Sequence, residues 1–201
     1  MNESIVPVTG WPPESRRITT FLPLNLGINC GNDCLVVGVG IPQPGRSQAA
    51  VLVENDQNLL LDCGAGTLLR LDEVGADLEA LDTVVLTHLH LDHVSDLLAL
   101  ANARYLADMP GLQVFGPQGT EVFFEIAKSV YPNLEKMAVA VQELKPMDSF
   151  TLKGFDIFAE EARHSVTALA YRLEADEKVV VYSGDTEPCP RVAALAEGPT
   201  C

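Results

Sequence analysis

Three of the four histidines in this 201-residue chain lie within six residues of one another. They belong to the segment 87–93, which reads Thr-His-Leu-His-Leu-Asp-His. A buried strand is predicted before this segment at 83–86, and apolar residues follow it at helical spacing between 94 and 105. We therefore expect the histidines in a loop that joins a strand to a helix.

The spacing of the polar residues in this segment favours metal binding. His88 and His90 are two residues apart, so in an extended loop they can point the same way. Asp92 and His93 begin the following helix and can point at a neighbouring position. Imidazole suits zinc, iron or manganese, and a carboxylate suits a hard or borderline ion. The segment predicts two adjacent metals, an arrangement that polarises a substrate oxygen and holds a hydroxide at neutral pH.

Three further residues stand at the ends of predicted strands. His164 lies between two strands, where a loop can return a ligand, although a hydrogen-bonded loop histidine is the structural alternative. Asp185 follows the strand 179–182 and is a candidate to bridge two metals, with a turn aspartate as the alternative. Asp62 has the same context and is a candidate to orient a ligand histidine, with a turn residue almost as good an interpretation.

The rest of the chain predicts a mixture of short strands and helices. Strands are expected at 35–39, 49–54, 58–61, 83–86, 113–115, 138–144, 155–162, 168–173 and 179–182. Helices are expected at 67–74, 94–105, 120–130 and 189–196. Residues 1 to about 32 contain four prolines and are predicted to be irregular. Strands that pair in hairpins, with helices between others, suggest sheets with helices outside them.

Together these residues resemble the metallo-β-lactamase superfamily. The His-x-His-x-Asp-His pattern, the aspartate at a strand end and Ser-Gly-Asp-Thr at 183–186 match its motifs, and the resemblance covers residues 34 to 201. Within the superfamily the chain is most similar to the ribonuclease Z-like branch, which includes phosphodiesterases and some arylsulfatases. The segments 115–119, 163–173 and 183–189 carry this closer similarity.

The resemblance implies a fold and a set of metal ligands. The fold would be an α/β sandwich of αββα type over residues 34–201, with its C-terminal part incomplete and residues 1–33 as an N-terminal extension. The site would hold two Zn²⁺ ions, with Mn²⁺ or Fe²⁺ as alternatives. His88, His90 and His164 would bind one zinc; Asp92 and His93 would bind the second, with Asp185 bridging.

The implied activity is hydrolysis of a phosphodiester or sulfate ester, with a small phosphate- or sulfate-ester substrate as the partner. Metal-bound hydroxide would attack phosphorus or sulfur, and Asp92 would be the catalytic residue that manages the proton. The alternatives are tRNA 3′-processing by a ribonuclease Z and a metal-binding module without catalysis. A thioester hydrolase of the glyoxalase type is a third alternative, which the residues around His164 disfavour.

Two features weigh against a nucleic-acid substrate. The net charge is −15, whereas proteins that grip nucleic acid normally present a basic patch. The tRNA-processing relatives carry a Pro-x-Lys-x-Arg-Asn segment and a long flexible arm. Here the segment 42–47 lacks the lysine and the asparagine, and only a helix and a short link separate Gly119 from Val139.

The end of the chain also departs from the family pattern. Relatives continue with a helix, a strand and a final histidine that completes the second metal site. Only 16 residues, 186–201, follow Asp185 here, and none of them is histidine. The expectation is a fragment of a longer protein, or else a site with a weaker second metal.

Composition limits the remaining possibilities. The five cysteines are odd in number and irregularly spaced, which favours free thiols in a reducing compartment. The N-terminus has no basic start followed by an apolar run, and no segment is apolar enough to span a bilayer. We expect a cytoplasmic protein without a membrane partner. Branch members are often dimers, so a homodimer is a further expectation, and the helix 120–130 is compatible with an interface.

Overall fold

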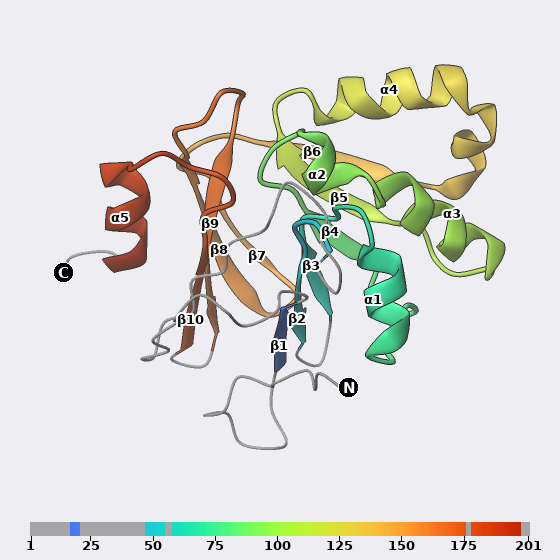
Figure 1. Ribbon diagram of the computed structural model, residues 1–201, viewed down its shortest axis with the longest axis horizontal. Coiled ribbons are helices and arrows are strands. Elements are labelled where there is room, and N and C mark those ends of the chain that lie inside the picture. The colour runs from blue at the N-terminus through green and yellow to red at the C-terminus, as the bar shows by residue number, and fades with distance from the viewer. Residues whose placement is uncertain (1–16, 21–46, 55–57, 176–177, 198–201) are drawn as a thin grey trace.

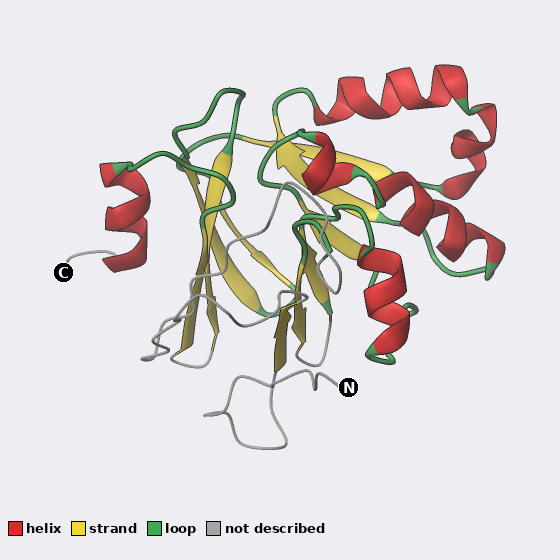
Figure 2. Ribbon diagram, viewed as in Figure 1, coloured by secondary structure: helices red, strands yellow, loops and turns green. Residues whose placement is uncertain are grey.

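The computed structural model describes residues 17–20, 47–54, 58–175 and 178–197. They form two β-sheets that pack face to face, with helices on the outer faces (Figures 1 and 2). Within these segments, none of the helices has the length and apolar character needed to cross a membrane. The strand predicted at 35–39 lies outside the described residues.

The first sheet has six strands in the order β1-β2-β3-β4-β5-β6. Its strands are β1 (Arg17–Thr20), β2 (Val51–Glu54), β3 (Leu59–Leu61), β4 (Thr83–Val85), β5 (Gln113–Pro117) and β6 (Ala140–Leu144). β1, β2 and β3 pair antiparallel, whereas β3 to β6 are parallel. Because the carboxyl ends of parallel strands meet at one edge of a sheet, the loops after β3, β4 and β5 gather there.

The central parallel strands β3 and β4 are buried on both faces, which is why they read as continuous apolar runs. Successive side chains of β3 alternate between two cores. Leu60 faces the core under the helices, whereas Leu59 and Leu61 face the core between the sheets. Val84 and Val85 divide in the same way, so β3 and β4 are held from both sides and the loops that follow them start from fixed positions.

The second sheet has four antiparallel strands in the order β10-β9-β8-β7. Its strands are β7 (Ser149–Leu152), β8 (Phe155–Glu161), β9 (Leu169–Ala175) and β10 (Lys178–Tyr182). Alternate residues of β8 and β9 point inward at the first sheet, among them Ile157 and Tyr171. The loop between β8 and β9 and the loop after β10 therefore end beside the loops of the first sheet.

Helices cover both outer faces (Figure 1). The elements are α1 (Thr67–Glu73), α2 (Leu91–Val94), α3 (Leu97–Leu106), α4 (Thr120–Val130), the 3₁₀ helix η1 (Pro132–Met137) and α5 (Pro190–Glu197). The helices α1, α3 and α4 lie over the first sheet, where Leu71, Leu100 and Phe124 are fully buried or nearly so. The helix α5 packs Val192 and Leu195 on the outer face of the second sheet. The layers run helix, sheet, sheet, helix.

Two sequence predictions about strands and loops were wrong. Residues 17–20 fall in the stretch predicted to be irregular, yet they form β1, because a four-residue segment can pair with the exposed edge of β2 whatever its own pattern. The strand β7 was not predicted, because its residues 149–152 are only half-buried or exposed. Its pairing with β8 decides its conformation.

The region around the helices also differs from the prediction. The single helix expected at 94–105 is two helices, α2 and α3, that break at Ser95 and Asp96. The Asp96 carboxylate accepts a hydrogen bond from the amide of Leu68 at 3.1 Å, a contact 28 residues away in sequence. The strand expected at 138–144 is shorter: β6 begins at Ala140, because Ala138 has a positive φ of 50°, outside the β region.

Arg104 is a buried cation that joins α3 to two loops. Its side chain, 1% exposed, donates through Nη1 to the carbonyl oxygens of Leu78 and Leu81, the latter at 2.7 Å. Nη2 donates to the carbonyl oxygen of Pro110 at 2.9 Å. Burial lowers the pKa of the guanidinium, but the three backbone carbonyls accept its hydrogen bonds in place of water.

We expect Arg104→Ala to lower the free energy of unfolding by about 2–4 kcal/mol, because three carbonyls lose a charged donor and the buried stem leaves a cavity. Lys128→Ala removes an exposed ion pair with Glu125 and should cost less than about 0.5 kcal/mol. Urea unfolding of the two variants measures the difference. Equal losses of unfolding free energy in the two variants would contradict a stabilising role for the buried Arg104 hydrogen bonds.

Candidate metal centre

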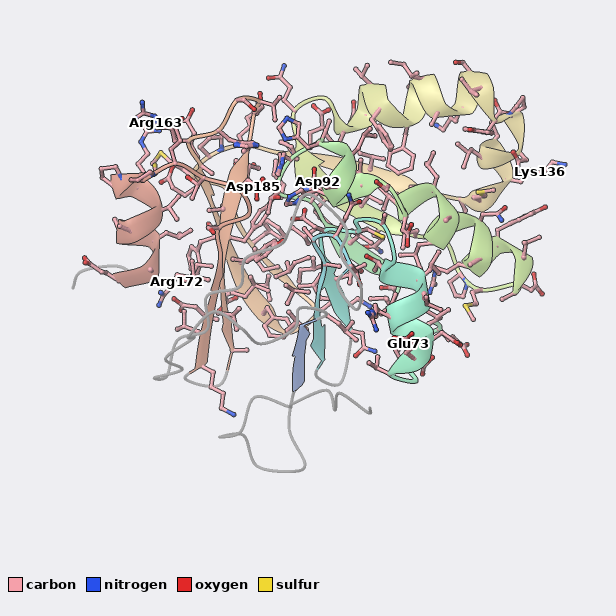
Figure 3. All side chains as sticks on the ribbon, viewed as in Figure 1. Glu73, Asp92, Lys136, Arg163, Arg172 and Asp185 are labelled. Carbon is pink, nitrogen blue, oxygen red and sulfur yellow. The ribbon has the colours of Figure 1, made fainter. Side chains whose placement is uncertain are left out.

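The loops at the shared edge of the two sheets bring all six predicted ligands together. His88 and His90 follow β4, and Asp92 and His93 lie in α2. His164 lies between β8 and β9, and Asp185 follows β10. Figure 3 shows Asp92, in α2, and Asp185, on the loop after β10, near each other at one end of the sandwich. His88 and Asp185 are 97 positions apart in the sequence, yet they belong to one site.

The first candidate ligand group is His88, His90 and His164. His88 Nε2 and His90 Nδ1 lie 3.1 Å apart, and His164 Nε2 lies 3.1 Å from the same His90 atom. A tetrahedral zinc ion with nitrogen ligands at 2.0–2.1 Å holds neighbouring nitrogens about 3.3 Å apart. The three nitrogens therefore have the separation that one such cation requires.

The second candidate group is His88, His93 and Asp185. His93 Nε2 lies 3.6 Å from Asp185 Oδ1 and 3.8 Å from Asp92 Oδ2. Asp92 belongs to neither group of atoms within 4.8 Å, so its predicted place on the second metal stays a prediction. The bridging role of Asp185 also stays a prediction, because the structure places this carboxylate in the second group alone.

The donor chemistry of the two groups fits a zinc-type cation. Imidazole nitrogens and carboxylate oxygens are its ordinary ligands. His88 is fully buried and belongs to both groups, so two cations held here would be neighbours. Burial and the charge of His93 lower the pKa of His88 to about 4, which leaves the ring neutral, as a ligand must be.

Asp62 orients His93, a member of the second ligand group. This carboxylate is fully buried, and its residue has a positive φ of 57°. Oδ2 lies 2.6 Å from His93 Nδ1 and accepts the Tyr182 hydroxyl at 2.7 Å. Oδ1 accepts the amide of Thr87 at 2.7 Å. The contact expected between Asp62 and a site histidine is present, and it directs His93 Nε2 toward Asp185.

Thr87 and Tyr182 belong to the site but were not predicted as site residues. A buried tyrosine hydroxyl needs a hydrogen-bond partner, so a tyrosine at the end of the apolar strand β10 was an available signal. The direction of that hydroxyl toward Asp62 depends on how the two sheets pack. Thr87 offered no signal of its own, because threonine is common in strands.

Gly184 is required by the same packing. Its φ is 54°, and a Cβ at this position would lie 2.7 Å from both Cβ and Oγ1 of Thr87. A larger residue would separate the loop after β10 from the loop after β4. The glycine in Ser-Gly-Asp therefore brings Asp185 close to the histidines.

The loops that carry His164 and Asp185 are joined to each other. The amide of Arg163 donates to Thr186 Oγ1 at 3.1 Å, and the amide of Glu187 donates to the Arg163 carbonyl at 2.7 Å. Arg163 Nε and Glu187 Oε2 form an exposed ion pair at 2.9 Å. These contacts keep the two ligands together although they come from different strand ends.

Residues 57–201 match the family model of the beta-lactamase superfamily domain, and the chain belongs to this superfamily. Ribonuclease Z of Methanopyrus kandleri is 35% identical over 142 residues, which are 70% of this chain and 48% of that protein. Ribonuclease Z of Mycobacterium marinum is 32% identical over 184 residues, 82% of this chain and 66% of that protein. The chain spans about half to two thirds of the length of these relatives.

Solved structures agree with this assignment. The metallo-beta-lactamase fold protein YhfI of Bacillus subtilis superposes with a TM-score of 0.69 at 25% identity, covering 88% of this chain and 64% of that one. Human tRNase Z, short form, superposes with a TM-score of 0.65 at 22% identity, covering 74% and 66%. The predicted superfamily, its ribonuclease Z-like branch and the α/β fold class are confirmed.

Metal binding should release about one proton per chain at roughly pH 7 to 9. Burial disfavours a charged His93, but the carboxylates of Asp185, at 3.6 Å, and Asp62, at 2.6 Å, outweigh burial and raise the pKa of His93 to about 10. A cation at Nε2 must displace that proton, whereas His88, with a pKa of about 4, has none to lose. The apparent affinity should rise with pH up to about 10. Titration calorimetry in buffers of different protonation enthalpy measures the release, and a value near zero would contradict it.

Proposed function

We propose that this protein is a metal-dependent hydrolase that cleaves a phosphodiester bond and holds two divalent cations, Zn²⁺ in the cell. The proposal assigns His88, His90 and His164 to one cation, and Asp92, His93 and Asp185 to the other. The observation that carries it is His88, which belongs to both ligand groups and so makes the two cations neighbours. Superfamily membership supports the same assignment.

The residues divide the work of the reaction. Bound cations supply Lewis-acid stabilisation of the charge on a phosphoryl oxygen and acidify a water molecule. The neutral His88 ring binds without losing a proton, and the nearby His93 ring lowers the pKa of Asp185, which keeps that carboxylate ionised. The Asp92 side chain is 21% exposed, so it reaches both the site and solvent. We assign it the role of moving the proton between the attacking water and the leaving group.

RNA is the substrate that the relatives favour. Proteins named ribonuclease Z match this chain at 29–35% identity, and a tRNase Z shares its fold. We therefore propose an RNA phosphodiester, with tRNA 3′-processing as the specific form, in preference to the small phosphate or sulfate ester predicted from the sequence.

A small phosphodiester is the second candidate, and two observations favour it. The net charge is −15. The helices α4 and η1 occupy residues 120–137 between β5 and β6, so this link holds compact helices in place of a long arm. A sulfate ester stays a prediction of the resemblance alone.

Activity assays test the proposal. The chain, and any longer product of the same gene, should hydrolyse bis-nitrophenyl phosphate with zinc or manganese. His88→Ala should lower kcat/KM by more than about 100-fold, because losing a ligand costs more than losing a partner of a ligand. Lys128→Ala, on the exposed side of α4, should be unchanged. No turnover by any form with either metal would overturn the proposal, as would full activity of His88→Ala.

The same assay separates the two substrate classes. An RNA with a 3′ extension should be cleaved with a higher kcat/KM than the chromogenic ester, and its KM should rise with salt, because phosphate contacts release counterions. A nitrophenyl sulfate serves as the third arm. Preference for the small phosphodiester, or for the sulfate, would identify the substrate class directly and exclude RNA as the favoured substrate.

A homodimer joined through α4 is a further proposal. Val122, Ile126 and Val130 recur at helical spacing on the outer face of this helix and are 59%, 62% and 62% exposed. Ile126→Glu should shift the sedimentation coefficient from dimer to monomer, because it places a charge in an apolar contact. Asn102→Glu on α3 is the control. A wild-type monomer at micromolar concentration would exclude the dimer.

Two remaining expectations stay predictions. They are a cytoplasmic location, and a domain boundary that treats residues 34–201 as the hydrolase domain and residues 1–33 as an extension. The strand β1 lies within that extension and is the edge strand of the first sheet.

A further inference from the structure

Thr87 lies at the junction of the two ligand groups. It follows β4, and it is fully buried. Its Oγ1 lies 2.8 Å from Asp62 Oδ2 and 3.1 Å from Asp62 Oδ1. The same oxygen lies 3.0 Å from His88 Nδ1 and 3.4 Å from His93 Nδ1. One hydroxyl therefore contacts the buried carboxylate and both histidines of the second group.

The single hydrogen of this hydroxyl determines the direction of the network. Asp62 already accepts the Tyr182 hydroxyl and the Thr87 amide, so it acts as an acceptor and takes the Thr87 hydroxyl hydrogen as well. Thr87 Oγ1 then has only lone pairs to offer His88 Nδ1. The His88 ring must carry its hydrogen on Nδ1, which leaves the Nε2 lone pair free. Nε2 is the atom that lies 3.1 Å from His90 Nδ1.

We propose that Thr87 is a positioning residue through which Asp62 fixes the tautomer and orientation of His88, as Asp62 fixes those of His93 by direct contact. This inference rests on the proposed metal site. Asp62 would thus reach a ligand of each cation, His93 by direct contact and His88 through the Thr87 hydroxyl. Tyr182, from the other sheet, holds that carboxylate in place.

Thr87→Val and Thr87→Ser test this contact from Asp62 through Thr87 to His88, called the relay below. Valine keeps the shape of threonine, and so its contact with Gly184, but removes the hydroxyl; serine keeps the hydroxyl. Cobalt(II) affinity, measured by competition with a chelator, should fall about 10- to 100-fold in Thr87→Val for the cation that His88 binds, as for other partners of metal ligands. Thr87→Ser should stay within about threefold of the wild type. The visible cobalt spectrum reports the geometry of each site.

A second measurement needs no metal. Long-range ¹⁵N–¹H spectra of the metal-free protein should show His88 protonated on Nδ1 in the wild type and in Thr87→Ser, and a mixture of tautomers in Thr87→Val. The four histidines of the chain make this spectrum simple to assign. If Thr87→Val unfolds, the serine variant still decides: loss of affinity or of the Nδ1–H tautomer in Thr87→Ser overturns the relay.

The outcomes separate this inference from the proposed function. Wild-type protein that binds cobalt but hydrolyses no ester overturns the function and leaves the relay standing. Wild-type protein that binds and hydrolyses, with Thr87→Val unchanged in affinity and tautomer, overturns the relay alone. Wild-type protein that binds no cobalt overturns both.

Discussion

The buried carboxylate of Asp62 is the interaction on which the site depends. An ionised carboxylate inside a protein costs several kcal/mol unless donors surround it. The donors here come from three places: the end of β4, the helix α2 and the end of β10. Because Tyr182 belongs to the second sheet and the other donors follow β4 of the first, their contacts with Asp62 hold the two sheets together where the candidate ligands meet. The contacts that supply hydrogen-bond donors to the buried Asp62 carboxylate are therefore also the contacts that assemble the site.

The topology explains why so few residues suffice to build the site. Parallel strands in the first sheet end at a common edge, and the second sheet sends the loop after β8 and the loop after β10 to the same place. The loop after β4 contributes His88 and His90, and the loops after β8 and β10 contribute one ligand each; each of these loops follows a strand that contributes to the core. The contacts of Arg163 with Thr186 and Glu187 then join the two loops of the second sheet.

The charges beside the site bear on the choice of substrate. Two arginines beside the second-sheet loops are each paired with a carboxylate, Arg163 with Glu187 and Arg191 with Glu161. Both pairs are exposed, so each is weak and can be exchanged for a phosphate. An acidic protein can still bind a polyanion through such a local exchange, whereas a small ester would leave the pairs intact. The relatives favour the first case and the overall charge favours the second.

The sequence by itself determined which residues could bind a metal and which family the chain resembles. Histidines two apart before a helix, and aspartates at strand ends, express local chemistry and local spacing, which can be read without a fold. The core strands of both sheets and most helices followed from periodicity for the same reason. The tertiary structure alone decided that β1 pairs with β2 and that β7 pairs with β8. It likewise decided the break between α2 and α3 and the partners of Asp62. It also made His88 the residue common to both ligand groups. These features depend on contacts between residues far apart in the chain, and no local pattern encodes where two sheets will meet.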